Sequence, residues 1–517
     1  MFAKVNSFQV SGLDAYPVTI EVDISYGLPT IIIVGLPDNA VKESKERVRA
    51  AIKNCGYPFE ARRITVNLAP ADIKKEGPSF DLAIALGILA ATGQIDPALL
   101  ARYAILGELS LDGKILPIKG CLSIAMGMSG DQFDGLIVPF DNARESAIAN
   151  TIAIYPARNL LEVVAFLQDP QNSAPFKVDI DSLFKQQIMN DTDFNDVKGQ
   201  CHVKRGLEVA AAGGHNALLI GPPGSGKTML ARRLPTILPD LTLKEALETT
   251  RIHSLIGLVN PNLGIVMTRP FRSPHHTSSD IALVGGGTFP RPGEISLAHH
   301  GVLFLDELPE FNRNVLEALR QPLEDNFVTV SRAARTTHFP SKIMLIGAMN
   351  PCPCGFFTDP RKECRCGPQK IQKYLSKISG PLLDRIDIHL EVPAVKYQDL
   401  IESKTCESSR DIKQRTTKAR VLQHKRFMAG TLHGNVPTIY ANAQMNQKHL
   451  KEFCKISDDS KGLMREAITG LGLSARAHDK ILKVSRTIAD LAGSESIKTE
   501  HLAEAIQYRS LDRNWWG

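Results

Sequence analysis

The chain has 517 residues, of which 43% are hydrophobic and 22% are charged, and its formal net charge is +6. This length and composition predict about three globular domains and exclude a largely disordered protein. The small positive charge is compatible with a polyanionic partner but does not establish one. The first residues lack the apolar core of a signal peptide, and no run of about 18 apolar residues could span a membrane. We therefore expect a cytoplasmic protein.

The chain divides into four parts. Residues 1–168 alternate strand-like and helix-like runs, which predicts an α/β or α+β domain. The polar stretch 169–187 contains two prolines and is expected to be a linker. A second α/β domain is expected over 188–395, and residues 396–517 are expected to be mostly helical. The predicted fold class is therefore a multidomain α/β protein with a helical C-terminal part.

A glycine-rich loop lies between an apolar strand-like run (217–220) and a helix-like run. Its sequence, GPPGSGKT, fits the phosphate-loop pattern G-x-x-x-x-G-K-[ST] in the context that the motif needs. Lys227 is expected to reach the β- and γ-phosphates of ATP, and the Thr228 hydroxyl to hold Mg²⁺. The candidate nucleotide-binding residues are Gly221, Pro222, Pro223, Gly224, Ser225, Gly226, Lys227 and Thr228.

Two further apolar strand-like runs end in polar side chains. Residues 301–305 lead to Asp306 and Glu307, and residues 343–349 lead to Asn350. Asp306 is expected to hold Mg²⁺, and Glu307 to polarise the attacking water as a general base. Asn350 could orient that water or sense the γ-phosphate, although a turn residue before proline is the alternative.

Two isolated arginines follow. Arg385 comes after an apolar helix end, and Arg476 lies at the start of a helix in the C-terminal part. Arg385 could act as an arginine finger on the nucleotide of a neighbouring subunit, whereas Arg476 could fold over the chain's own nucleotide. Surface ion pairs are the alternative for both residues.

Four cysteines cluster directly after Asn350, in the stretch PCPCGFFTDPRKECRCG. Two close thiol pairs suit tetrahedral zinc, although C-x-C is tighter than the usual C-x₂-C spacing. Reduced thiols in a loop, or a redox pair, remain alternatives. The candidate zinc ligands are Cys352, Cys354, Cys364 and Cys366.

The order of these motifs resembles the AAA+ ATPases of the magnesium-chelatase and minichromosome-maintenance-helicase branch. Four sequence segments are more specific to this family: RSPHHT (272–277), LVGGG (283–287), PGEISLAHHG (292–301) and NPCPCG (350–355). With these segments the whole chain resembles the YifB/ComM family of magnesium-chelatase-like proteins. The resemblance implies an AAA+ core with a C-terminal magnesium-chelatase-type lid, and an ATP-driven homohexameric ring. For ComM proteins it also implies a helicase that drives DNA branch migration in competence and natural transformation.

The resemblance also assigns roles. Lys227, Thr228, Asp306 and Glu307 match the Walker residues, Asn350 matches sensor 1, Arg385 the finger and Arg476 sensor 2. Residues 327–339 resemble a hairpin that precedes sensor 1, with Arg332 and Arg335 near its turn. In a ring these arginines could contact single-stranded or branched DNA, and a solvated surface hairpin is the alternative. The histidine pairs His275–His276 and His299–His300 are expected to serve structural or interface roles rather than to bind metal.

The N-terminal part resembles the Lon protease domain at Gly77-Pro-Ser79 and over 107–120. The lysine that would activate Ser79 is missing, because Leu122 stands at its position and Lys119 lies three residues early. Ser79 is therefore expected to cap a helix, and the domain to serve assembly or DNA binding.

We thus predict an Mg²⁺-dependent ATPase that moves branched or single-stranded DNA in natural transformation or homologous recombination. One alternative is a chelatase-type motor that remodels a protein complex without DNA. Another is an ATP-dependent Lon-like protease, and a third is a DNA-binding regulator whose ATPase controls only its assembly.

Overall fold

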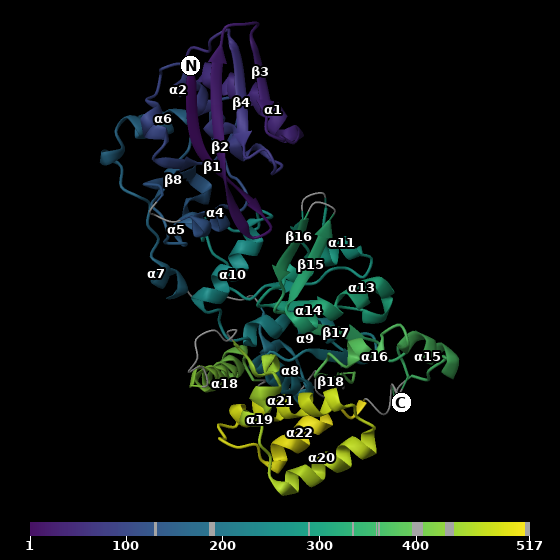
Figure 1. The fold of residues 1–517 in the computed structure, drawn as a ribbon. Coiled ribbons are helices and arrows are strands. Elements are labelled where there is room, and N and C mark those ends of the chain that lie inside the picture. The colour runs from purple at the N-terminus through teal and green to yellow at the C-terminus, as the bar shows by residue number, and fades with distance from the viewer. Residues whose placement is uncertain are drawn as a thin grey trace. The chain divides into compact units, whose positions relative to one another are not determined.

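The computed structural model describes residues 1–128, 132–185, 192–287, 290–332, 335–357, 359, 362–394, 407–429 and 439–511. The chain forms two compact units (Figure 1). The first comprises Met1–Gln187 together with Leu243–Met267, and the second comprises Ile188–Thr242 together with Thr268–Gly517. Among the described residues, no helix combines the length and the apolar character that crossing a membrane requires.

The first unit is built on a mixed sheet of seven strands in the order β3-β4-β2-β1-β5-β8-β9. Strand β2 pairs antiparallel with β1 and with β4, and the remaining neighbours are parallel. The strands are β1 (Phe2–Ser11), β2 (Asp14–Ser25), β3 (Thr30–Val34), β4 (Arg63–Ala69), β5 (Tyr103–Ile105), β8 (Gly135–Pro139) and β9 (Ile154–Ala157), and β6 (Glu108–Leu109) and β7 (Ile115–Leu116) form a separate short hairpin.

Helix α2 (Asp81–Ala91) is the centre of this unit's core, because every one of its residues is buried. It packs on β1 and β2 so closely that a Cβ on Gly87 would lie 2.7 Å from Val22 Cγ2. Helix α1 (Asn39–Asn54) buries one face, and the Asp38 carboxylate caps it by accepting a 2.8 Å hydrogen bond from Val41 N. The other helices are α3 (Pro97–Leu100), α4 (Cys121–Gly127), α5 (Ala143–Ala147), α6 (Leu160–Gln168) and α7 (Ile180–Lys185).

The segment Leu243–Met267 follows the phosphate loop in sequence but packs with the first unit. Its helix α10 (Leu243–Ser254) contacts α4, and the carbonyl of Ser254 accepts a 3.0 Å hydrogen bond from Gly120 N. The half-buried Arg251 side chain donates to the Leu13 carbonyl at 2.7 Å. These contacts explain why the segment belongs with the N-terminal residues.

The second unit has a five-stranded sheet in the order β11-β14-β17-β10-β18, and all of its strand pairs are parallel. The strands are β11 (Phe271–Arg272), β14 (Val302–Leu305), β17 (Met344–Met349), β10 (Ala217–Ile220) and β18 (Ile388–Glu391). Every residue of β10, β14 and β17 is buried, as expected for a parallel sheet that is covered on both faces. The prediction of an α/β core is therefore confirmed, and the chain leaves all five strands at the same edge of the sheet.

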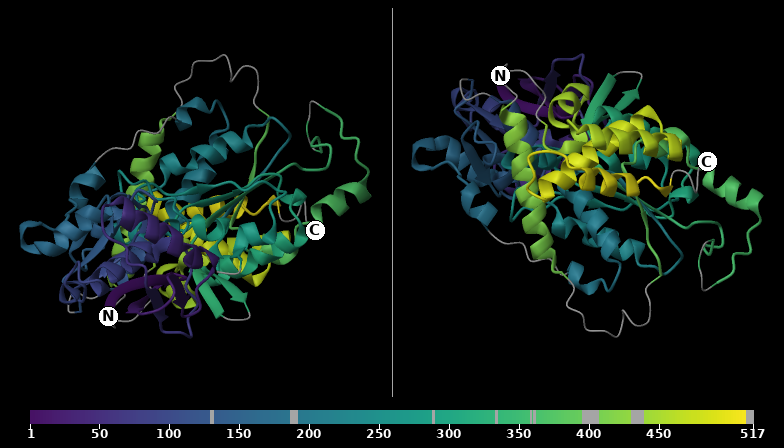
Figure 2. Two further views of the ribbon diagram at one scale, coloured as in Figure 1. Left: turned by 90° about the horizontal axis from the view of Figure 1, so that it is seen from above. Right: turned by 90° about the horizontal axis from the view of Figure 1, so that it is seen from below.

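Helices and short elements surround this sheet (Figures 1 and 2). The core helices are α8 (Cys201–Gly213), α9 (Lys227–Arg233), α11 (Asp280–Val284), α12 (Glu294–Leu297), α13 (Arg313–Ala318), α14 (Arg320–Asp325), α15 (Pro368–Leu375) and α16 (Gly380–Leu383). Two antiparallel hairpins are β12 (Gly285–Gly286) with β13 (Arg291–Pro292), and β15 (Phe327–Arg332) with β16 (Arg335–Pro340). The C-terminal helices are α18 (Ser409–Ala429), α19 (Gln447–Phe453), α20 (Asp458–Leu471), α21 (Ala475–Leu491) and α22 (Thr499–Gln507).

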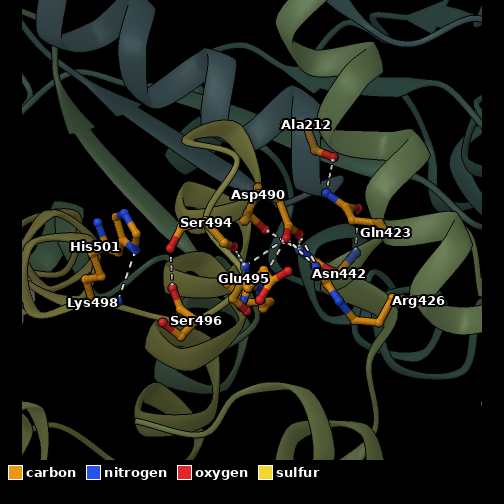
Figure 3. Close-up of polar contacts among 12 residues, drawn as sticks. Ala212, Gln423, Arg426, Asn442, Asp490, Ser494, Glu495, Ser496, Lys498 and His501 are labelled. Atoms are coloured by element: carbon orange, nitrogen blue, oxygen red, sulfur yellow. Dashed lines mark hydrogen bonds and ion pairs between the residues drawn. The ribbon is translucent and has the colours of Figure 1, made fainter. Parts of the chain in front are cut away.

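A buried polar cluster joins the C-terminal helices (Figure 3). Asp490 of α21 accepts hydrogen bonds from Arg426 of α18, from Arg486 Nε at 3.1 Å and from Asn442 Nδ2 at 2.8 Å. The side chains of Asp490 and Arg486 are only 1% and 2% exposed. Buried charges of this kind are tolerated only when they are paired, so the cluster orients α18 and α21 against each other.

The same cluster reaches the core of the unit. Gln423 of α18 accepts a hydrogen bond from Asn442 N at 3.1 Å and donates one to the Ala212 carbonyl of α8 at 3.1 Å. Helices α18 and α21 both pack on α8, which precedes the phosphate-loop strand β10. The C-terminal helices are therefore attached directly to the element that leads into the candidate site.

Candidate nucleotide site

The phosphate loop begins where β10 ends and finishes where α9 begins. Gly224 and Gly226 have φ values of 74° and 89°, a left-handed conformation that favours glycine. Gly221 is also required, because a Cβ there would lie 2.1 Å from the Val392 carbonyl oxygen. The Ser225 hydroxyl is buried and lacks a hydrogen-bond partner among the described residues. The loop thus presents backbone N–H groups and a helix N-terminus, which suit phosphate oxygens.

Lys227 lies inside this loop. Its ammonium group donates to the carbonyls of Gly221 at 2.7 Å and Pro222 at 2.9 Å, and to Asn350 Oδ1 at 3.2 Å. Burial lowers the pKa of Lys227 to about 8, and the charge of nearby Asp306 partly opposes this shift. Two residues singled out from the sequence, Lys227 and Asn350, therefore meet at the carboxyl edge of the sheet.

Thr228 and Asp306 also come together. The Thr228 hydroxyl donates a 2.6 Å hydrogen bond to Asp306 Oδ2, although β10 and β14 are separated by β17. A hydroxyl and a carboxylate oxygen are hard ligands of the kind that Mg²⁺ prefers beside nucleotide phosphates, so the pair fits this ion. Thr228 and Asp306 would hold Mg²⁺, which would supply positive charge against the phosphates of ATP.

Glu307 has an unusual backbone and an unexpected partner. Its φ is +52°, which is uncommon for a residue other than glycine. Its carboxylate is 56% exposed and lies 3.2 Å from His276 Nδ1. The sequence interpretation treated His276 as a structural residue and missed this contact, which joins a loop after β11 to the end of β14. The carboxylate proposed as the general base is therefore paired with an imidazole.

An ion pair fixes the loop that carries His276. Arg272, at the end of β11, donates through Nε and Nη2 to the two oxygens of Glu294, both at 2.6 Å. Such a bidentate pair sets geometry as well as charge. It connects the RSPHHT segment to the PGEISLAHHG segment, so these two specific motifs form one structure beside the site.

Arg385 lies at the opposite edge of the sheet from the phosphate loop. Its carbonyl accepts a 3.0 Å hydrogen bond from Asn216 Nδ2, and Asn216 immediately precedes β10. The four residues of β10 span roughly 13 Å at about 3.3 Å per residue, and this length separates the Arg385 backbone from Gly221. The structure thus does not bring Arg385 to the chain's own Lys227.

Arg476 lies beside Arg385. Its Nη2 is 3.8 Å from Glu324 Oε1, the same oxygen that pairs with Arg385 Nη2. At the start of α21, the capping residue Ser474 donates to Asp384 Oδ1 at 3.5 Å. One turn further along α21, Lys480 donates to Asp387 Oδ1 at 2.6 Å. The two candidate arginines are therefore held together on one surface.

The β15–β16 hairpin places Arg332 and Arg335 opposite each other at its tip. Residues 333–334 and the side chains of the two arginines lie outside the described part of the chain. Val328, Val330 and Phe339 are buried, so one face of the hairpin packs on the unit.

The four clustered cysteines converge after β17. The Sγ atoms of Cys352 and Cys354 are 3.3 Å apart, and Cys364 Sγ lies 3.7 Å from the first and 3.6 Å from the second. All four sulfur atoms lie within 4.8 Å of one another. Tetrahedral zinc with Zn–S bonds of about 2.3 Å places its sulfur ligands about 3.8 Å apart, so the donor set fits this ion.

The N-terminal unit places Leu122 and Ser79 in ordinary structural settings. Leu122, at the position where a Lon-type lysine would stand, belongs to α4 and is fully buried. Lys119 is exposed, and the Ser79 carbonyl accepts a 2.9 Å hydrogen bond from Gly107 N. Ser79 lies in a short 3₁₀ turn, Pro78–Phe80, that leads into α2. The expectation that Ser79 caps the helix is wrong, because Phe80 is the capping residue of α2 and no described side chain caps this helix.

Comparison with known proteins identifies relatives of the whole chain. Residues 193–400 match the family Magnesium chelatase, subunit ChlI, residues 20–142 match Subunit ChlI of Mg-chelatase, and residues 406–509 match Magnesium chelatase, subunit ChlI C-terminal. The chain is 45% identical to the competence protein ComM of Haemophilus influenzae over 514 residues, which cover 99% of this chain and 98% of ComM. It is 44% identical to YifB of Escherichia coli over 508 residues (97% and 96%), and 42% identical to YifB of Salmonella typhimurium over 519 residues (99% and 97%).

These matches agree with the geometry. The magnesium-chelatase family implies an AAA+ ATPase that uses ATP and Mg²⁺. The phosphate loop, the Thr228–Asp306 pair and Asn350, gathered at the carboxyl edge of a parallel sheet, fit the nucleotide site of such an enzyme. The family expected from the sequence motifs is confirmed: the chain belongs to the ComM/YifB family of magnesium-chelatase-like proteins.

Proposed function

We propose that this protein is an ATP-driven motor that assembles as a homohexameric ring and drives branch migration of DNA in natural transformation or homologous recombination. The observation that carries this proposal is the division of the catalytic groups between two edges of one sheet. Lys227, Thr228 and Asp306 gather at the carboxyl edge, whereas Arg385 lies at the amino edge. A complete site then requires two subunits. We place the protein in the cytoplasm, where a DNA motor has its substrate.

Within one subunit, the loop from Gly221 to Thr228 binds the phosphates of ATP. Lys227 leaves its carbonyl partners for the β- and γ-phosphates, and Thr228 and Asp306 hold Mg²⁺. Glu307 accepts a proton from the attacking water, and Asn350 positions that water or the γ-phosphate. Each role follows from the carboxyl-edge position of the residue.

Between subunits, Arg385 contacts the γ-phosphate of the neighbour and neutralises charge in the transition state. Arg476 shares the carboxylate partner of Arg385, and this arrangement supports an action on the neighbour's nucleotide too. From the sequence, Arg476 could either fold over the chain's own nucleotide or form a surface ion pair. The revised role makes hydrolysis depend on assembly through two arginines rather than one.

The β15–β16 hairpin is the proposed DNA contact. Its tip carries Arg332 and Arg335, and arginines bind the phosphates of single-stranded and branched DNA without regard to sequence. ATP and ADP states that differ in their contacts with the ring would shift the position of the hairpin. The competence role in the name of the Haemophilus relative supports DNA as the substrate.

The decisive experiment measures ATP-dependent branch migration on synthetic three- and four-stranded DNA junctions. The wild type should move junctions, and Glu307→Gln should bind ATP and DNA but move none. If no junction moved and no DNA changed the rate of ATP hydrolysis, the proposal of a DNA motor would be rejected. The remaining candidate would then be a chelatase-type motor that remodels a protein complex.

We further propose that residues 1–168 form a Lon-protease-like domain without proteolytic activity, followed by a linker over 169–187. The buried Leu122 supports this proposal, because no base is supplied to Ser79 from that position. The AAA+ core would extend over 188–395, with a magnesium-chelatase-type lid over 396–517. Casein cleavage that Ser79→Ala abolishes would instead support an ATP-dependent protease.

We also propose that Cys352, Cys354, Cys364 and Cys366 hold a structural zinc ion. The sulfur separations of 3.3–3.7 Å among three of them support this assignment. The segment that carries these cysteines (residues 352–366, here called the knuckle) follows Asn350 closely. Its Gly355 packs tightly on the phosphate loop, since a Cβ on Gly355 would lie 2.5 Å from Pro223 Cδ. The bound metal would therefore fix the position of Asn350 relative to the phosphate loop.

A further inference from the structure

Glu324 faces two arginines at once. Its Oε1 is paired with Arg385 Nη2 and lies 3.8 Å from Arg476 Nη2. The Arg385 side chain is only 12% exposed, and its Nε is buried without a hydrogen-bond partner in the described part of the structure. One carboxylate cannot neutralise two guanidinium groups, so one positive charge remains for another anion.

Glu324 would compete with a γ-phosphate for the guanidinium group of Arg385. A guanidinium binds carboxylates and phosphates through the same N–H groups, often in the same bidentate geometry. The Nη2 of Arg385 cannot contact Glu324 and a γ-phosphate in full at the same time. Contact of Arg385 with a γ-phosphate therefore requires the Arg385–Glu324 pair to open.

Glu324 lies at the base of the β15–β16 hairpin. It belongs to α14, and only Asp325 and Asn326 separate it from the first residue of β15. Gln321 of α14 donates a 3.1 Å hydrogen bond to Thr329 of β15. The carbonyl of Asn326 accepts a 2.8 Å hydrogen bond from Ser341 N, which closes the hairpin at this base. Helix α14 and the hairpin thus form one connected piece.

We propose that Glu324 is a positioning residue that couples the nucleotide of the neighbouring subunit to the β15–β16 hairpin. It holds Arg385 and Arg476 while the neighbouring site lacks a γ-phosphate, and it is released when both arginines turn to that phosphate. Release frees α14 and, with it, the base of the hairpin. The inference deepens the proposed function and rests on it, because it needs a ring in which the two arginines act on a neighbour.

The test uses Glu324→Gln in the full-length chain, since glutamine keeps the shape and removes the charge. Without DNA, kcat for ATP hydrolysis should rise about threefold, because Arg385 no longer has to leave a carboxylate. Stimulation by DNA and the number of junctions moved per ATP should fall at least about fivefold. In hydrogen exchange, the difference between the ADP and non-hydrolysable ATP states over 327–340 should disappear.

The matched control is Glu317→Gln on the preceding helix. Glu317 pairs with Arg320 at 2.7 Å and contacts neither Arg385 nor Arg476 in the described ion pairs, so this variant should behave like the wild type. The inference is overturned if Glu324→Gln keeps both the wild-type rate without DNA and the nucleotide-dependent exchange of the hairpin. It is equally overturned if Glu317→Gln reproduces every effect.

The two proposals can fail separately. A wild type that moves junctions while Glu324→Gln moves as many per ATP would reject the coupling and keep the DNA motor. A wild type whose hairpin exchange responds to nucleotide through Glu324, but which moves no junction, would keep the coupling and reject the DNA motor.

Discussion

His276 Nδ1 lies 3.2 Å from a carboxylate oxygen of Glu307, the residue proposed as the general base. The pair joins two loops that leave different strands of the parallel sheet, and Arg272 holds the histidine loop through Glu294. A carboxylate that is engaged by an imidazole is less available to the attacking water. The contact with His276 therefore restrains Glu307.

His276→Ala should therefore raise the basal rate of ATP hydrolysis. A partly exposed polar contact of this kind contributes about 0.2–1 kcal/mol, so kcat should rise by up to about fivefold while KM changes little. His275→Ala is the control, because His275 bonds Thr277 at 2.9 Å instead of Glu307. A fall in kcat as deep as that of Glu307→Gln would show instead that His276 orients the base for catalysis.

ATP affinity should depend on pH through Lys227. The pKa of this residue is lowered to about 8 by burial, so below that pH the free protein carries the positive charge that phosphates require. Above it, binding must take up a proton, and affinity should fall by up to about tenfold per pH unit. Titration with a fluorescent ATP analogue between pH 7 and about 9.5 measures this effect.

The lowered pKa of Lys227 affects folding stability in the opposite direction from ATP affinity. Between the folded pKa of about 8 and the unfolded value of 10.5, the unfolded chain binds more protons at Lys227, so this group's contribution to stability increases with pH. Deprotonation of Lys227 above pH 8 therefore weakens nucleotide binding without destabilising the fold. Lys227→Met should bind ATP more weakly, and this remaining affinity should no longer depend on pH. If the variant kept the pH dependence, another titrating group would be its cause.

The convergence of Lys227, Thr228, Asp306 and Asn350 could be predicted from the sequence, because the phosphate loop, Asp306 and Asn350 each follow an apolar strand. Parallel strands bring such positions to one edge without any further information. The partners of Glu307 and of the two arginines could not be predicted. His276 and Glu324 approach them through irregular loops and short helices, where local sequence does not determine distance. The packing of Leu243–Met267 on the first unit likewise depends on long-range contacts such as that of Arg251 with Leu13.

Asp490→Ala should destabilise the second unit strongly. It would leave the Arg486 guanidinium, which is 2% exposed, and the partly buried Arg426 without their shared carboxylate. Removing one partner of a buried ion pair costs about 3–5 kcal/mol. In calorimetry, the transition of this unit should move down by more than about 5 °C. Asp458→Ala removes an exposed partner of Lys461 and should leave the transition unchanged, and equal shifts in both variants would contradict the role of the buried cluster.

Purified protein should contain about one zinc ion per chain, as measured by atomic emission, if the four thiols form a tetrathiolate site. Cys354→Ser and Cys364→Ser should each lose the metal. They should also bind ATP several-fold more weakly, because Gly355 of the knuckle packs against Pro223 of the phosphate loop. Cys201→Ser is the matched control, since Cys201 is exposed and lies outside the cluster. Metal-free wild-type protein with full ATP affinity would exclude the zinc site, and mass spectrometry would then distinguish free thiols from a disulfide.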